Sequence, residues 1–97
     1  PAPDLDAMES VFHAVHIASY RSLDLARRGW QLYAQNPALD GLDAVATPVS
    51  LPDSGDWYRL KAGPFDTRGA AEAACAALAA RGDGCAVTDF NGRALGQ

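Results

Sequence analysis

The amino-acid sequence predicts an α+β fold of the ferredoxin-like, split βαβ class: a four-stranded antiparallel sheet with two helices on one face. Three observations support this prediction. The expected elements follow the order strand, helix, strand, strand, helix, strand, which is the order of that class. The two strand–helix–strand halves share a similar pattern of apolar and capping residues. The second strand contains Pro48, and proline is tolerated mainly on edge strands, where this class places its second strand.

The first half of the chain divides into three elements. A strand is expected over residues 11–20, where the apolar side chains alternate. Ser22 is a suitable N-cap for the helix that follows. This helix must end before Asn36, because Pro37 disfavours helical geometry in the residue before it. A second strand is expected over residues 42–51.

The second half of the chain repeats this order. A turn at residues 52–55 leads into a third strand over residues 57–65. Thr67 can cap a second helix, and Gly82 suits the left-handed conformation that often ends a helix. A fourth strand is expected over residues 85–90.

The third strand, WYRLKAGPF, has two different faces, because successive side chains of a strand point to opposite sides of the sheet. One set is apolar and is expected to pack beneath the helices: Tyr58, Leu60 and Ala62. The other set is Trp57, Arg59 and Lys61, on the face without helices. A large exposed indole beside a cation is unusual for a monomer. The indole of Trp57 and the guanidinium of Arg59 can also stack on each other.

Length, charge and hydropathy restrict the class of protein. The chain has 97 residues, a formal net charge of −4 and a pI near 4.8. This length fits one domain, which we place at residues 11–90, between a linker remnant at residues 1–10 and a polar C-terminal tail at residues 91–97. The linker-like start suggests part of a longer protein. The acidic balance argues against a general nucleic-acid binder, and no stretch approaches the roughly 20 apolar residues that span a bilayer.

Two cysteines, Cys75 and Cys85, form either two separate buried thiols or a structural disulfide, which requires an oxidising compartment. In the expected fold, Cys75 lies on the core side of the second helix, and Cys85 faces that helix from the fourth strand. The two then lie within disulfide distance, which favours the disulfide. Two thiols alone do not complete a structural zinc site, so no metal is expected.

Neither catalysis nor a cofactor is expected. His13 and His16 share the first strand but point to opposite faces. Cys75 lies on a core stripe away from any base, and no pair of carboxylates flanks a recognisable cleft. The sequence therefore predicts a binding module and not an enzyme.

The candidate binding surface is the sheet face that carries no helix. By alternation, His16 on the first strand and Ala86 on the fourth join the third-strand residues on this face. The simpler alternative is that this face is only the solvated side of an antiparallel sheet.

Three segments resemble the SPOR domain, the peptidoglycan-binding module of bacterial cell-division and cell-wall proteins. VHIASY resembles the end of the family's first strand and the turn into its first helix. WYRLKAGPF resembles the third-strand signature, and AEAACAALAARGDGCAV resembles the second-helix segment, including its paired cysteines. The resemblance covers residues 11–90 and depends on all three segments occurring in the family's order and spacing.

The resemblance implies binding to septal glycan strands that lack stem peptides, through the helix-free sheet face. With Lys61 from that face, the implied glycan-binding residues are His16, Ser19, Trp57, Arg59, Lys61 and Ala86. His16 stands where the family usually has Gln, and Ala18 replaces the usual Gly. The implied setting is the periplasm, where the domain, a monomer, would target a membrane-anchored or exported parent protein to the cell wall or division site.

Two other classes of function fit the same fold. An RNA-recognition domain also places aromatic residues on its two central strands, but here the first strand offers His16 and Ala18 instead, and the net charge is negative. The main alternative is a protein–protein interaction module of a cell-envelope protein, which would hold its partner through the edge strand near Pro48 or through Trp57.

Overall fold

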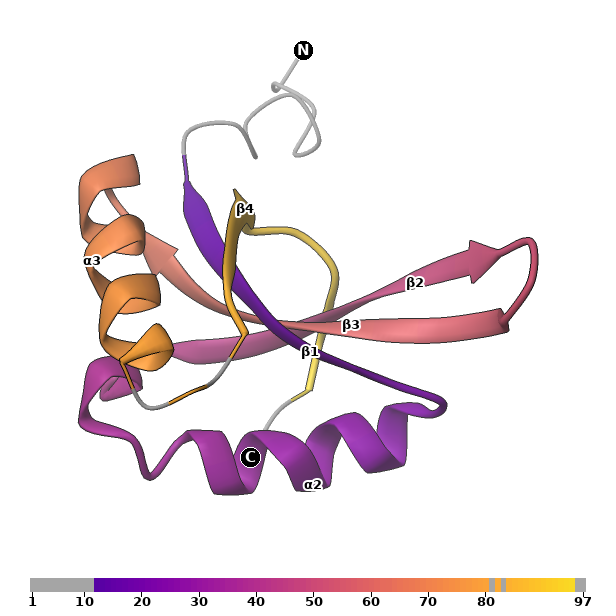
Figure 1. Cartoon of the computed structure of the whole chain (residues 1–97). Coiled ribbons are helices and arrows are strands. Elements are labelled where there is room, and N and C mark those ends of the chain that lie inside the picture. The colour runs from indigo at the N-terminus through magenta and orange to yellow at the C-terminus, as the bar shows by residue number, and fades with distance from the viewer. Residues whose placement is uncertain (1–11, 81, 83, 96–97) are drawn as a thin grey trace, which may run out of the picture.

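The computed structural model describes residues 12–80, 82 and 84–95, so the expected linker at residues 1–10 lies outside the described residues. The described part is an α+β fold, as predicted (Figure 1). Its elements are β1 (His13–Tyr20), α2 (Leu23–Tyr33), the short 3-10 helix η2 (Pro37–Leu39), β2 (Asp43–Leu51), β3 (Gly55–Phe65), α3 (Arg68–Ala79), β4 (Ala86–Asp89) and β5 (Arg93–Ala94).

The sheet has five strands in the order β4-β1-β3-β2-β5, and all neighbouring strands are antiparallel. The prediction of four strands was one short, because β5 pairs with Val45 and Ala46 of β2. Pro48 lies beyond that pairing, on a part of β2 whose outer edge pairs with no other described strand. Such an edge position suits a proline, which has no N–H to donate. The central positions of β1 and β3 are as predicted, and the ferredoxin-like assignment stays a prediction.

The helices begin where the sequence predicts them. The hydroxyl oxygen of Ser22 accepts a hydrogen bond from the backbone N–H of Leu25 at 3.1 Å, which caps α2. Thr67 caps α3 in the same way, accepting from Ala70 at 3.1 Å. Gly82 has a positive φ of 88°, as expected for the residue that redirects the chain after a helix.

The core lies between the helices and one face of the sheet. Both helices pack against β1 and β3 (Figure 1). In addition, α2 contacts β2, and α3 contacts β4. The buried residues of this layer include Val15, Ile17, Ala26, Trp30, Leu60, Ala62, Ala71, Ala74 and Leu78. Several of them are alanines, which allow the helices to approach the strands closely. None of the described helices has the length and apolar character that crossing a membrane requires.

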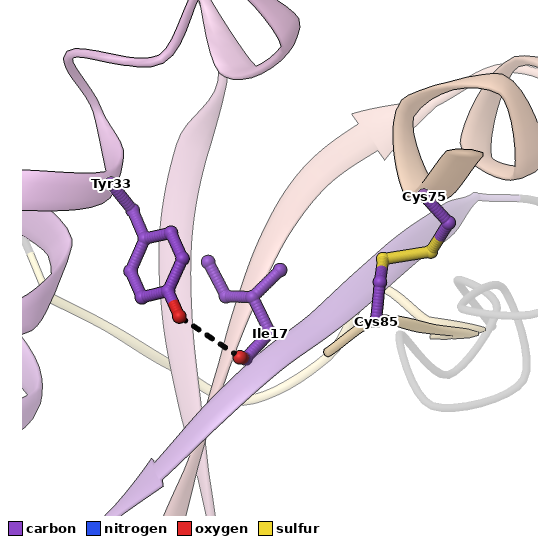
Figure 2. The surroundings of a disulfide bond; sticks show 4 residues. All are labelled: Ile17, Tyr33, Cys75 and Cys85. Carbon is purple, nitrogen blue, oxygen red and sulfur yellow. Dashed lines mark hydrogen bonds between the residues drawn. A yellow bond between two sulfur atoms is a disulfide. The ribbon is translucent and has the colours of Figure 1, made fainter. Parts of the chain in front are cut away.

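A disulfide joins Cys75 on α3 to Cys85, which directly precedes β4, over a Cα–Cα distance of 5.3 Å (Figure 2). This confirms the predicted pairing. It ties the helix layer to an edge strand of only four residues. A disulfide is also consistent with an oxidising compartment.

Residues 91–95 do not behave as the polar tail that the sequence suggests. After β4 the chain crosses the sheet and adds β5 to the opposite edge (Figure 1). Leu95 is 3% exposed and belongs to the core. Its carbonyl oxygen accepts a hydrogen bond from Nε of Arg27 on α2 at 3.0 Å. A strand of two residues is too short to show alternation, so no sequence pattern indicates this contact.

Candidate functional site

A β-bulge in β1 shapes the helix-free face. His16 pairs with Lys61 and Ala18 with Leu60, so Ile17 is the extra residue on the β1 side. The hydroxyl of Tyr33 on α2 donates a hydrogen bond to the Ile17 carbonyl oxygen at 3.3 Å (Figure 2). The backbone group that the bulge removes from regular pairing thus has a partner.

The bulge places Ser19 on the same side of the sheet as His16. In an uninterrupted strand, Ser19 would share the buried face of Val15. Beyond the bulge, Ser19 instead pairs directly with Arg59 of β3, and directly paired residues project to the same face. The resemblance implied a role for Ser19, whereas strand alternation alone would have excluded it.

His16 is held by two local contacts. Its Nε2 lies 3.0 Å from the carbonyl oxygen of Ala18 and 3.2 Å from Oγ of Ser19. A carbonyl only accepts, so Nε2 carries the proton in the neutral ring and donates. Burial lowers the pKa of His16; the bond to Ala18 opposes this effect, and the positive charges of Arg59 and Lys61 add to it. The ring is therefore neutral at pH 7.

The sequence suggested that Trp57 stacks with Arg59. In the structure, Trp57 stacks with Arg21 instead. The guanidinium carbon of Arg21 lies 3.9 Å from the centroid of the Trp57 ring. Arg21 is fixed at the same time by hydrogen bonds from Nη1 to the backbone carbonyl oxygens of Ser54 and of Asp56, the latter at 3.2 Å. Nε1 of Trp57 is buried and has no hydrogen-bond partner among residues 12–80, 82 and 84–95.

Sequence reasoning missed Arg21, although the strand register contains the signal that would find it. Tyr20 ends β1 and pairs with Tyr58. The next residue of the chain therefore lies near Trp57, the residue that precedes Tyr58 on β3. A correct register would have indicated Arg21 as the cation nearest to the indole.

Four of the six predicted site residues line one shallow hollow of about 260 Å³ on the helix-free face. The residues that line it are His16, Ser19, Val49, Leu51, Ser54, Trp57 and Arg59. The lining contains an aromatic ring, aliphatic side chains, hydroxyls, an imidazole and a guanidinium, but no carboxylate. The hollow spans β1, β3 and β2 toward the end of the β2–β3 hairpin.

The remaining two predicted residues do not line this hollow. Lys61 points to the helix-free side but is only 6% exposed. Its Nζ donates to the backbone oxygen of Asp89 at 3.2 Å and to Oδ1 of Asn91 at 2.6 Å. The expectation that Lys61 lies on an open surface is therefore corrected, because the segment after β4 covers it. Ala86 is exposed and pairs with His16, but it adds no polar group.

The segment that covers Lys61 fits closely against the sheet. A Cβ on Gly63 would lie 2.8 Å from Cδ1 of Phe90, so Phe90 packs directly on this glycine. Gly92 has a φ of 130°, and a Cβ there would lie 2.6 Å from the carbonyl oxygen of Ala46. The helix-free face is therefore covered at one end and open at the other, where the hollow lies.

A larger hollow of about 490 Å³ lies at the β2–β5 edge and contains none of the predicted site residues. It is lined by Trp30, Gln31, Ala34, Leu42, Asp43, Ala44, Val45, Phe90 and Ala94. Its lining includes the carboxylate of Asp43 but no cation, so it lacks the convergent donors of the hollow around Trp57. Size alone therefore does not make it the better candidate.

The comparison with protein families decides between the possible classes of protein. The family model described as SPOR domain matches residues 9–88 of the 97-residue chain. The chain belongs to the SPOR domain family. SPOR domains are associated with peptidoglycan binding and cell division, occur in cell-envelope proteins, and form a binding family and not a catalytic one. No curated protein and no solved structure gives a significant match.

The match to the SPOR family ends before the segment that covers Lys61. Residues 89–95, which include β5 and the buried Leu95, follow the last matched residue. The part of this SPOR domain that the structure describes also contains no group of three or more His, Cys, Asp or Glu residues arranged to hold a metal ion.

Proposed function

We propose that this SPOR domain binds glycan strands of peptidoglycan that lack stem peptides, through the hollow on the helix-free face. The observation that carries the proposal is the convergence of Trp57, His16, Ser19 and Arg59 on that hollow. An aromatic ring surrounded by hydrogen-bonding groups is the arrangement that a carbohydrate requires.

The chemistry of each side chain suits a glycan. The apolar C–H face of a sugar ring stacks on the indole of Trp57, which also excludes water there. Arg59 and Ser19 donate to hydroxyl, acetamido or carboxylate oxygens. The hollow is shallow and open along the sheet, which favours a segment of a long polymer over a small molecule that would need a deep pocket.

A stem peptide on the bound sugar would project from a strand that lies flat on the sheet. Such a peptide would collide with the segment over Lys61 or with the β2–β3 hairpin, and this collision would select strands without peptides. In the cell, the domain would direct a larger parent protein to cell wall at the division site, in the periplasm. The disulfide agrees with that compartment.

A protein partner is the second candidate, and one feature favours it. The end of β2, from Pro48 to Leu51, has an edge that pairs with no strand in the described part of the chain, and Leu51 is 41% exposed. An extended segment of another cell-envelope protein can add to such an edge.

Sedimentation with purified sacculi, before and after amidase treatment, tests the proposal. We expect amidase treatment to increase the amount of bound protein, and we expect Trp57→Ala to abolish the increase. Leu32→Ala is the control, because it removes a large apolar side chain that is 73% exposed on α2, away from the hollow. Equal or absent binding on both kinds of sacculi, with no effect of Trp57→Ala, would favour the protein partner.

A further inference from the structure

The hollow is a locally positive site on an acidic protein. The chain has a net charge of −4, yet none of the described residues that line the hollow carries a carboxylate. Lys61, which is buried beneath the adjoining segment, adds a second positive charge on the same face. Because Lys61 is buried, solvent ions screen its positive charge less than they screen the charge of a surface lysine.

Arg59 is the exposed cation in this hollow, and its charge is not used by the fold. Within the described part of the chain, no carboxylate lies within ion-pair distance of Arg59. Other arginines of the chain have such a partner: Arg28 lies 3.5 Å from Asp24, and Arg68 lies 3.4 Å from Glu72. An unpaired guanidinium in a hollow lined without acids is suited to an anionic group of a ligand.

We infer that Arg59 recognises a carboxylate of the bound glycan, namely the lactyl carboxylate that is released when an amidase removes the stem peptide. This inference rests on the proposed function. Amidase hydrolysis converts the lactyl amide, which is neutral, into a carboxylate and a free amine on the peptide. Each stripped muramic acid therefore gains a negative charge on its lactyl group, where the peptide was attached. Attraction to that charge selects stripped strands directly, in addition to any steric exclusion of the peptide.

The neighbours of Arg59 are arranged to complete a carboxylate site. Ser19 pairs with Arg59 across the strands. Nε2 of His16 carries one hydrogen, which it shares between the Ala18 carbonyl oxygen at 3.0 Å and Oγ of Ser19 at 3.2 Å. Oγ of Ser19 is then an acceptor toward His16, and its hydroxyl hydrogen is left to donate to a ligand. The guanidinium offers two parallel N–H groups to a carboxylate, and Trp57, two residues before Arg59 on the same face of β3, carries the sugar ring.

Three glycan probes test the inference in the same binding assay: strands that keep their stem peptides, stripped strands, and stripped strands whose carboxylates have been reduced to alcohols. The reduced strands have neither peptide nor charge. We expect them to bind about ten-fold more weakly than stripped strands, a difference equal to one charge-assisted hydrogen bond. Equal binding of the reduced and stripped strands would overturn the inference and leave the proposed function standing. Failure of both to bind would overturn the proposed function itself.

Variants at Arg59 identify the residue responsible. Arg59→Gln should lower the affinity for stripped strands about ten-fold and should lower the affinity for reduced strands by a clearly smaller factor, because those strands keep only neutral acceptors for Arg59. Arg59→Lys should recover part of the loss on stripped strands. Arg28→Gln is the matched control, because it removes the same charge from the exposed surface of α2, and we expect it to bind both probes like the unaltered domain. An equal loss on both probes in Arg59→Gln would show that Arg59 does not read the carboxylate.

Discussion

The hydroxyl of Tyr33 on α2 donates a hydrogen bond to the carbonyl oxygen of Ile17, the bulged residue of β1, at 3.3 Å. This bond links the helix layer to the candidate site on the other side of the sheet. The bulge decides that Ser19 projects beside His16 and Arg59. A half-buried helical side chain therefore supports the arrangement of residues on a face that it does not touch.

Replacing Tyr33 by Phe should cost about 1 kcal/mol of unfolding free energy, because it leaves the Ile17 carbonyl without this donor. It should also weaken binding to stripped glycan strands, because Ser19 is then held less firmly. Urea unfolding and a binding titration measure the two effects. Tyr58→Phe is the control, since the Tyr58 hydroxyl has no hydrogen bond to any of the described residues. Equal effects of the two substitutions would contradict the proposed support of the bulge.

The sequence allowed a correct prediction of the faces of β3 but not of the whole site. Alternation along residues 57–62 of β3 separates Trp57 and Arg59 from the buried Leu60 and Ala62 on the opposite face, and the structure agrees. The same rule fails at Ser19, because one extra residue in β1 reverses the alternation. The carbonyl of the bulged residue has its partner on α2, 16 residues further along the chain, so no local pattern reveals the bulge. Only the resemblance to the family indicated Ser19.

Lys61 shows a second limit of strand alternation. The pattern gives the side of the sheet to which a residue points, and Lys61 does point to the helix-free side. The alternation does not show whether another segment of the chain covers that side of the sheet. The covering segment comes from the C-terminal end of the chain and reaches Lys61 through Asp89 and Asn91, contacts that depend on the path of the chain after β4.

Arg21 should act as a positioning residue for Trp57. It stacks on one face of the indole and is fixed by two backbone carbonyl oxygens of the β2–β3 hairpin. We expect Arg21→Gln to weaken glycan binding several-fold, although Arg21 does not line the hollow. The indole ¹H–¹⁵N signal of Trp57 should shift at the same time, because the ring loses its cation.

The conservative variant and a control separate positioning from simple loss of charge. Arg21→Lys keeps a cation over the ring and should recover part of the affinity, and Arg28→Gln should move neither the Trp57 signal nor the affinity. A Trp57 signal that is unchanged in Arg21→Gln would contradict the assignment.

His16 should make the stability of the domain depend on pH in one direction. Burial lowers its pKa in the folded protein below the ordinary value of 6.5. As the pH falls through 6.5, the unfolded chain takes up the proton before the folded chain does, so the free energy of unfolding decreases until the folded-state pKa has been passed. Above that range both states are neutral and the contribution is fully present.

His16→Gln removes this titration and keeps a side-chain donor for the Ala18 carbonyl. Urea unfolding at a series of pH values from 8 to 5, carried out on both proteins, should therefore show that the unaltered domain loses stability relative to the variant on the acid side. The comparison cancels the titration of the carboxylates that both proteins share. A stability difference that stays constant over this range would contradict the assignment to His16.

Leu95 tests whether the C-terminal segment is part of the folded domain. It lies in the core at 3% exposure, although the family match ends at residue 88. We expect Leu95→Ala to cost about 3 kcal/mol, the usual cost of truncating a buried leucine. Leu32→Ala, the same change at a residue that is 73% exposed, should cost less than about 0.5 kcal/mol.

Chemical unfolding measured with the disulfide intact gives both values for these two leucine variants. A small effect at both positions would mean that the segment does not hold its place over the sheet. Lys61 would then be free to join the glycan surface, as the sequence first suggested. A large effect at Leu95 alone would mean instead that residues 89–95, which follow the family match, complete the core of this domain. The same segment would then also limit the open part of the helix-free face, because it covers Lys61.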